Sequence, residues 1–179
     1  MVEDRIWIVT GEIGTGKSTL CKLAVEHARQ TGLHAAGLLS PAVFEDGTKV
    51  GIRVVDAARG VSRRLAWLRS AEARTLETKR WSFDPEAVEW GNQVLVEAAP
   101  TDLLIIDELG PLEFDRGKGW VEGFRVLEEG NYRAALVVVR PSLVEQARSR
   151  WPDAEVIRLA EGDDLERKSR MAVDRILSN

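Results

Sequence analysis

The chain has 179 residues, of which 44% are apolar and 30% are charged, and its formal net charge is −4. This size and composition predict one soluble globular domain with a sizeable core, and the acidic balance argues against a dedicated nucleic-acid-binding protein. One cysteine and two histidines exclude an intrachain disulfide and argue against a zinc site. Because the chain has no membrane-length apolar run and no basic leader, we expect a cytoplasmic protein without a membrane partner.

The first predicted elements are a buried strand and an amphipathic helix. The apolar run RIWIV at residues 5–9 predicts the strand. Apolar residues at helical spacing predict a helix over residues 17–30, which Gly32 ends. A second short apolar run, at residues 34–39, predicts the next strand.

Residues 40–82 interrupt this alternation, and we expect them to form an inserted β-hairpin region. The turn sequence EDG at residues 45–47 leads into KVGIRVVDA, whose β-branched and polar residues are typical of a hairpin strand. Residues 62–77 are charged and have no clear period, so we expect a loop or a short helix there.

Apolar strands alternate with helices in the remainder of the chain. This alternation is typical of a parallel sheet covered by helices on both faces. We therefore expect an α/β fold with a mainly parallel sheet, formed by residues 1–179 as a single domain. The expected strands are 103–108, 134–139 and 155–159, and the expected helices are 85–99, 121–129, 142–150 and 163–177.

The sequence between the first strand and the first helix has the pattern of a phosphate-binding loop. Residues 11–18 read GEIGTGKS, which matches G-x-x-x-x-G-K-[ST] in full. Glycines allow successive backbone N–H groups to turn inward around a phosphate, and the start of the helix adds further N–H groups. We expect the nucleotide to be bound by Gly11, Glu12, Ile13, Gly14, Thr15, Gly16, Lys17, Ser18 and Thr19.

Four side chains have the chemistry that phosphoryl transfer needs. Lys17 would bridge the β- and γ-phosphate oxygens as a catalytic residue, and the Ser18 hydroxyl would bind Mg²⁺. Asp107 follows the apolar run at residues 103–106, where α/β sheets hold their sites, and would be the second protein group at the metal. Glu108 points to the other face of the strand and would orient or deprotonate the attacking water.

These acidic residues also have simpler interpretations. Asp107 could be a turn aspartate at the end of a strand, and Glu108 could be a surface glutamate. The sequence DELG at residues 107–110 also matches the D-x-x-G motif of GTP-binding switches. Because the chain has no Asn-Lys pair to form the N-K-x-D guanine-reading motif, the sequence argues against such a switch.

The segments GEIGTGKSTL, GLLSPAVFEDGTKVGIRVVD and LLIIDELGPLEF together resemble the thermophilic-type, or cancer-related, nucleoside-triphosphatase family in order and spacing. The resemblance extends from Ile6 to about Leu159. It implies a three-layer, RecA-like P-loop fold, Mg²⁺ as cofactor, and slow hydrolysis of several nucleoside triphosphates to diphosphates. The positions that match the family motifs are Lys17, Ser18, Asp107, Glu108, Gly110 and Glu113, and the last of these has no role that the residues themselves predict.

The chain departs from the family pattern at two places. Residues 42–44 read AVF where the family has a Glu-Val-Arg-like stretch, so the role of that arginine does not carry over. Residues 115–119 read DRGKG where the family has a serine-containing link. This loop could be a mobile lid over the phosphates or a solvated turn, and the residue types favour the turn.

Phosphoryl transfer gains from an arginine placed against the charge that develops on the γ-phosphate. Arg140 follows a predicted strand at the edge where the site should lie, and we choose it as the catalytic cation. Arg63 in the inserted region is the next candidate, followed by Arg53 and Arg116. Any of these residues could instead be an ordinary surface arginine.

The sequence therefore predicts a Mg²⁺-dependent nucleoside triphosphatase that converts ATP, GTP and other triphosphates to diphosphate and phosphate. One alternative is a small nucleotide or nucleoside kinase, in which arginines between residues 51 and 80 would bind the phosphate of an acceptor. The other alternative is a nucleotide-dependent binding module whose slow hydrolysis acts as a timer.

Overall fold

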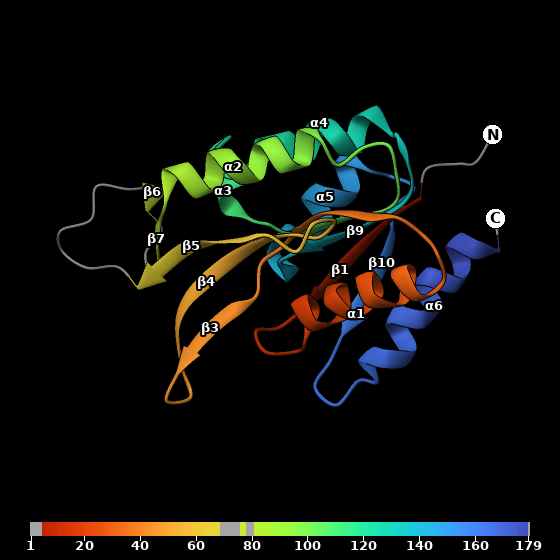
Figure 1. Ribbon diagram of the computed structural model, residues 1–179, viewed down its shortest axis with the longest axis horizontal. Helices are drawn as coiled ribbons and strands as arrows, with labels where there is room; N and C mark the ends of the chain where they lie inside the picture. Colours follow the sequence, from red (N-terminus) through yellow and green to blue (C-terminus); the bar gives the residue numbers. More distant parts are fainter. Residues whose placement is uncertain (1–4, 69–75, 78–80, 179) are drawn as a thin grey trace.

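Helices cover both faces of one open sheet in the computed structural model, which describes residues 5–68, 76–77 and 81–178 (Figure 1). The α/β class expected from the sequence is confirmed. In the described part of the chain, no helix combines the length and apolarity needed to cross a bilayer.

The strands are β1 (Arg5–Gly11), β2 (Ala35–Leu39), β3 (Ala42–Glu45), β4 (Thr48–Asp56), β5 (Ser62–Leu68), β6 (Leu76–Glu77), β7 (Trp81–Phe83), β8 (Thr101–Leu109), β9 (Tyr132–Val139) and β10 (Glu155–Leu159). The helices are α1 (Lys17–Gln30), α2 (Pro85–Val96), α3 (Pro111–Phe114), α4 (Val121–Glu129), α5 (Val144–Arg150) and α6 (Leu165–Leu177), with a 3₁₀ turn η1 (Pro141–Leu143) before α5.

The sheet has a parallel and an antiparallel part. Its strand order is β10-β1-β9-β8-β2-β4-β5-β7-β6, and β3 pairs with β4. The strands from β10 to β2 are parallel, and we call them the parallel region. The strands β3 to β7 pair in antiparallel fashion, and we call them the antiparallel region. Because the carboxyl ends of parallel strands meet at one edge of a sheet, the residues that follow β1, β2, β8 and β9 lie close together there.

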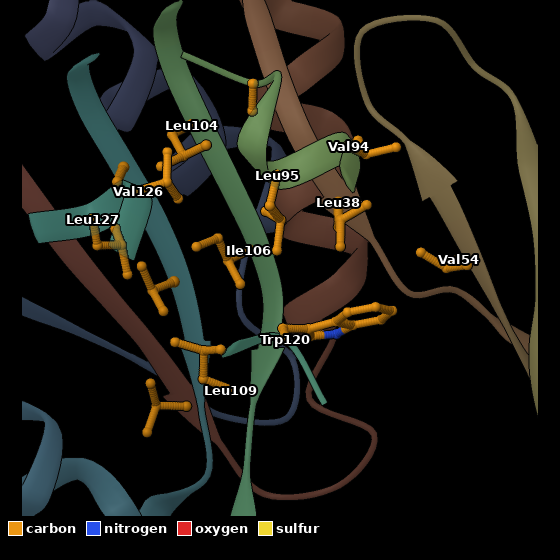
Figure 2. Close-up of a cluster of buried hydrophobic side chains, with 14 of the residues drawn as sticks. Leu38, Val54, Val94, Leu95, Leu104, Ile106, Leu109, Trp120, Val126 and Leu127 are labelled. Carbon is orange, nitrogen blue, oxygen red and sulfur yellow. The ribbon is translucent and has the colours of Figure 1, made fainter. Parts of the chain in front are cut away.

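Two hydrophobic layers enclose the parallel region. Alternate residues of β8 face opposite layers, so that Leu103 and Ile105 pack with α1 and α6, whereas Leu104 and Ile106 pack with α2 and α4. Figure 2 shows the second layer, where side chains of α2 and α4 meet those of β2 and β8. Trp7 of β1 is fully buried in the first layer. This burial on both faces explains why the strands of the parallel region read as continuous apolar runs.

The expectation of a loop or short helix over residues 62–77 is wrong where the structure describes this segment, because Ser62–Leu68 forms β5 and Leu76–Glu77 forms β6. Residues 69–75 lie outside the described residues. The register of β5 against β4 shifts by a bulge, so burial does not alternate strictly along the strand. Leu65 and Ala66 are therefore both buried, and the two-residue period that would have predicted a strand is lost.

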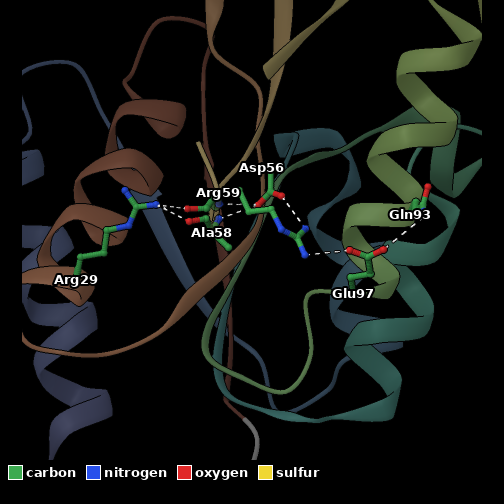
Figure 3. A network of polar contacts seen from close by, with 7 residues as sticks. Arg29, Asp56, Ala58, Arg59, Gln93 and Glu97 are labelled. Atoms are coloured by element: carbon green, nitrogen blue, oxygen red, sulfur yellow. Dashed lines mark hydrogen bonds and ion pairs between the residues drawn. The ribbon is translucent and has the colours of Figure 1, made fainter. Parts of the chain in front are cut away.

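A polar network attaches the antiparallel region to the helices on both faces of the sheet (Figure 3). Arg29, near the end of α1, donates hydrogen bonds to the carbonyl oxygens of residues 57–58 in the turn after β4. In the same turn, Asp56 accepts a hydrogen bond from the guanidinium of Arg59 at 3.1 Å. Arg59 also pairs with Glu97 at the end of α2, at 3.1 Å. The turn is therefore held between α1 and α2.

Candidate nucleotide-binding site

The loop between β1 and α1 has a backbone that only glycine accommodates at several points. Gly14 and Gly16 have φ angles of 86° and 88°, which other residues rarely adopt. A Cβ on Gly16 would collide with the side chain of Leu165 at the start of α6, and one on Gly11 would lie 2.5 Å from the carbonyl oxygen of Leu159. The glycines thus let the loop pack closely against β10 and α6, while the first turn of α1 presents unpaired N–H groups beside it.

Lys17, the first residue of α1, turns its side chain back over this loop. Its ammonium donates hydrogen bonds of 2.7 Å to the carbonyl oxygens of Gly11 and Glu12. Ile13 in the loop is 95% exposed, and Thr19 lies exposed on α1. A positive charge therefore lies on the loop, where phosphate oxygens could take the place of the two carbonyl oxygens.

Asp107 lies buried against the start of α1, with a hydrogen bond to each carboxylate oxygen. The Ser18 hydroxyl donates to Oδ1 at 3.1 Å, and the backbone N–H of Ser40 donates to Oδ2 at 2.9 Å. Burial raises the pKa of Asp107 to about 6, and the hydrogen bonds from Ser40 and Ser18 act in the opposite direction. The structure thus joins the residue at the end of β8 to the loop after β1, as the sequence predicts.

The residues at this junction fit a magnesium ion. Hydroxyl and carboxylate oxygens are the ligands that Mg²⁺ prefers, and Ser18 and Asp107 present one of each within hydrogen-bond distance. A cation beside Asp107 would also favour the charged form of the carboxyl group that burial disfavours. Ser18 and Asp107 could therefore hold the metal while phosphate oxygens and water complete its coordination.

Glu108 and Arg140 meet at the same edge of the sheet, at the ends of the neighbouring strands β8 and β9. Arg140 Nε donates a hydrogen bond to Glu108 Oε1. A Cβ built on Gly110 would lie 3.7 Å from Glu108 Oε1, 3.7 Å from Glu113 Oε2 and 3.9 Å from Arg140 Nε, so these side chains surround Gly110. Both members of the pair remain accessible, with 37% of the Glu108 side chain and 55% of the Arg140 side chain exposed.

Two of the other arginines suggested by the sequence make contacts away from Glu108. Arg63 stacks on the ring of Trp90, 4.9 Å from its centroid, and Arg53 donates a hydrogen bond to Ser62. Arg116 lies in the loop that follows α3. The structure therefore brings Arg140 to Glu108, whereas Arg63 of β5 contacts Trp90 of α2 and Arg53 of β4 contacts Ser62 of β5.

Glu113, for which the residues themselves predict no role, is a buried carboxyl group. It is only 8% exposed, and it accepts hydrogen bonds from the backbone N–H groups of Gly110 at 2.8 Å and Trp120 at 2.9 Å. Burial raises its pKa to about 7, while these hydrogen bonds act in the opposite direction. The Glu113 carboxylate thereby caps the start of α3, because Gly110 is the residue before the helix and its N–H has no partner within the helix. The glutamate three residues after Gly110 was the signal that could have revealed this contact.

The loop at residues 115–119 is attached to the helices on both of its sides. The N–H of Lys118 donates to the carbonyl oxygen of Leu112 at 2.8 Å, and the side-chain amide of Asn92 in α2 donates to that of Gly119 at 2.8 Å. Gly119 also lies directly against Glu113, where any Cβ would collide with the carboxylate. These contacts anchor the end of the glycine-rich segment, and the N–H of Asp115, which donates to the carbonyl oxygen of Pro111 at 3.1 Å, anchors its start.

The chain is similar to known proteins in sequence and in fold. The model of the NTPase family matches residues 6–170. The nucleoside-triphosphatase THEP1 of Ignicoccus hospitalis is 38% identical over 105 residues, which cover 59% of this chain and 58% of that protein's length. The nucleoside-triphosphatase THEP1 of Caldivirga maquilingensis is 28% identical over 152 residues, which cover 85% of this chain and 84% of that protein. The solution structure of a human cancer-related nucleoside triphosphatase has the same fold, with a TM-score of 0.72 and 21% identity over 98% of each chain.

Proposed function

The chain belongs to the NTPase family, and on that premise we propose that its site is a Mg²⁺-dependent nucleoside triphosphatase site that transfers the γ-phosphate to water. The observation that carries the proposal is the 3.1 Å hydrogen bond from Ser18 to Asp107, which joins the phosphate loop to the end of β8 across 89 residues of sequence. ATP, GTP and other triphosphates are the proposed substrates, because the loop would bind the phosphates that all of them share.

In this proposal, main-chain N–H groups and the ammonium group of Lys17 bind the phosphates of the nucleotide. The N–H groups of the loop at residues 11–18 surround the phosphates. Lys17 exchanges the carbonyl oxygens of Gly11 and Glu12 for oxygens of the β- and γ-phosphates. Ser18 and Asp107 would hold Mg²⁺, whose charge offsets that of the same phosphate oxygens.

Hydrolysis requires a group that orients water and accepts its proton. Glu108 is suited to this role because it lies next to Asp107, contacts Arg140, and is partly exposed. The water oxygen forms a bond to the γ-phosphorus, the bond to the β–γ bridging oxygen breaks, and the diphosphate leaves while Glu108 takes the proton of the water. Arg140, which contacts Glu108, would stabilise the negative charge that develops on the transferred group.

The substitution Glu108→Gln tests this assignment, because it keeps the shape of the side chain and removes its ability to accept a proton. We expect kcat for phosphate release to fall by roughly 10²–10⁴-fold. The affinity for a non-hydrolysable triphosphate analogue, measured by calorimetry, should remain close to that of the wild type. Equal turnover in the two proteins would reject Glu108 as the activating group.

Glu97→Gln is a matched control for that experiment. Glu97 is also a glutamate paired with an arginine, at 3.1 Å from Arg59, but it precedes β8 and so lies at the opposite edge of the sheet from Glu108. We expect this variant to keep full activity. Phosphate release without any added acceptor would support the hydrolase, whereas release that requires a nucleoside or nucleotide acceptor would support a kinase.

A further inference from the structure

Ser40 lies beside Asp107 on the neighbouring strand of the parallel region. It directly follows β2, which runs parallel to β8 with Leu38 opposite Ile106. Its backbone N–H donates a 2.9 Å hydrogen bond to Asp107 Oδ2. Pro41 follows it and restricts the backbone of Ser40 to extended conformations, which fixes the direction of this donor.

Two elements thus orient the carboxylate of Asp107. The Ser18 hydroxyl in α1 engages Oδ1, and the Ser40 N–H after β2 engages Oδ2. Both hydrogen bonds favour the charged form of the carboxyl group, against the burial that raises its pKa. Because each oxygen has a donor from a different element, the carboxylate has little freedom to rotate.

The side chain of Ser40 adds a second observation. Its hydroxyl oxygen is buried and, among the residues that the structure describes, has no hydrogen-bond partner. Buried hydroxyl groups in proteins are nearly always paired with protein or water, because an unpaired one loses its hydrogen bonds to solvent. Because the backbone of Ser40 contacts Asp107, a water molecule or ligand atom bound at this junction could supply the partner of the hydroxyl.

We propose that Ser40 is a positioning residue for the hydrolysis, whose N–H orients Asp107 and whose hydroxyl accepts a hydrogen bond from a water molecule of the Mg²⁺ shell. The inference rests on the proposed function. Mg²⁺ keeps several of its waters when proteins bind it, and groups that contact the ligands from outside control affinity. A serine hydroxyl accepts such a bond while its own proton remains available for a phosphate oxygen.

The test measures metal binding rather than turnover. Mn²⁺ serves as the probe, and its dissociation constant is measured by electron paramagnetic resonance in the presence of a non-hydrolysable triphosphate analogue. Ser40→Ala removes the hydroxyl and leaves the backbone N–H in place. We expect this variant to bind Mn²⁺ roughly tenfold more weakly than the wild type, and Ser40→Thr, which keeps a hydroxyl, to retain the wild-type affinity.

Ser82→Ala is the matched control. Ser82 in β7 also has a buried hydroxyl without a described partner, but it lies in the antiparallel region. We expect its Mn²⁺ affinity to equal that of the wild type. The inference fails if Ser40→Ala binds Mn²⁺ as tightly as the wild type, if Ser40→Thr is weakened as much as Ser40→Ala, or if Ser82→Ala is weakened equally. In each of these cases the wild type still binds the probe and the proposed function stands, whereas a wild type that binds no Mn²⁺ with the analogue would reject both.

Discussion

The parallel and antiparallel regions share one sheet, but they use their charged residues differently. In the parallel region, opposite charges gather at the ends of strands, where Asp107 is 2% exposed and Glu108 contacts Arg140. In the antiparallel region, cationic side chains lie over aromatic rings. These pairs are Lys49 over Trp81 at 5.2 Å, Arg63 over Trp90 at 4.9 Å, and Arg64 over Trp67 at 6.0 Å from the ring centroid.

This difference separates two uses of a cation. An arginine stacked on a ring contributes about 0.5–1 kcal/mol to packing at an exposed site, and it is already engaged before any ligand arrives. Lys17 and Arg140 instead contact oxygen atoms at the edge of the sheet, and phosphate oxygens could replace these partners. In the proposed function, the parallel region therefore holds the phosphate chemistry, whereas the cations of the antiparallel region contribute to packing.

Two substitutions, one at a cation of each region, test whether only the parallel region contacts the phosphates. Lys17→Ala removes a charge from the phosphate loop, and we expect kcat/KM for phosphate release to fall by roughly 10²–10³-fold. Arg63→Ala removes a charge from the antiparallel region, where the side chain is stacked on Trp90, and we expect kcat/KM to remain unchanged. Comparable losses of kcat/KM in both variants would show that the antiparallel region also contacts the phosphates.

The sequence predicted much of the parallel region because local pattern and tertiary environment agree there. The phosphate loop is recognisable because its glycines, lysine and serine are adjacent in sequence, between a strand and a helix. Asp107 was predictable because strands buried on both faces are continuous apolar runs, so a charged residue at the end of such a run is conspicuous. The sequence predicted that Arg140 lies at the edge of the sheet where the site should lie, and the pairing of β8 with β9 brings it against Glu108.

The parts that the sequence did not reveal depend on contacts between distant residues. The bulge between β4 and β5 removed the two-residue period of Ser62–Leu68, and no local signal replaced it. Ser40 engages Asp107 through its backbone, so its residue type gave no indication of the contact. The sequence predicted no role for Glu113, because its environment depends on the backbone N–H groups of Gly110 and of Trp120, which lies seven residues further along the chain.

Glu113→Gln tests how a buried carboxyl group beside the parallel region affects the pH dependence of stability. Burial raises the pKa of Glu113 from 4.5 to about 7, so between these pH values the unfolded chain has lost a proton that the folded chain keeps. The free energy of unfolding should therefore fall as the pH rises, by about 3 kcal/mol in total, and the loss should be complete near pH 7. Glutamine does not titrate, so urea unfolding of the variant from pH 4 to pH 8 should show a shallower pH dependence.

A residual pH dependence from Asp107 and a control variant at Glu45 complete the design of that experiment. Asp107, whose pKa burial also raises, to about 6, will leave a residual slope of the same sign in the variant. Glu45→Gln is the control, because Glu45 is an exposed residue of β3 in the antiparallel region, and we expect the wild-type slope to persist. An unchanged slope in Glu113→Gln would contradict the assignment of a raised pKa to this carboxyl group.

The smallest effect is expected where the two regions are joined. Arg29→Met removes the hydrogen bonds from α1 to the carbonyl oxygens of residues 57–58 and keeps most of the aliphatic side chain, so we expect the free energy of unfolding to fall by about 1 kcal/mol. Because α1 begins at the phosphate loop, kcat/KM reports whether the hydrogen bonds of Arg29 affect the site. We expect kcat/KM to stay at the wild-type value, and Arg29→Lys, which keeps a donor, to recover part of the stability. A fall in kcat/KM with little loss of stability would instead mean that the antiparallel region acts on the phosphate loop through α1, and the functional separation of the two regions would no longer hold.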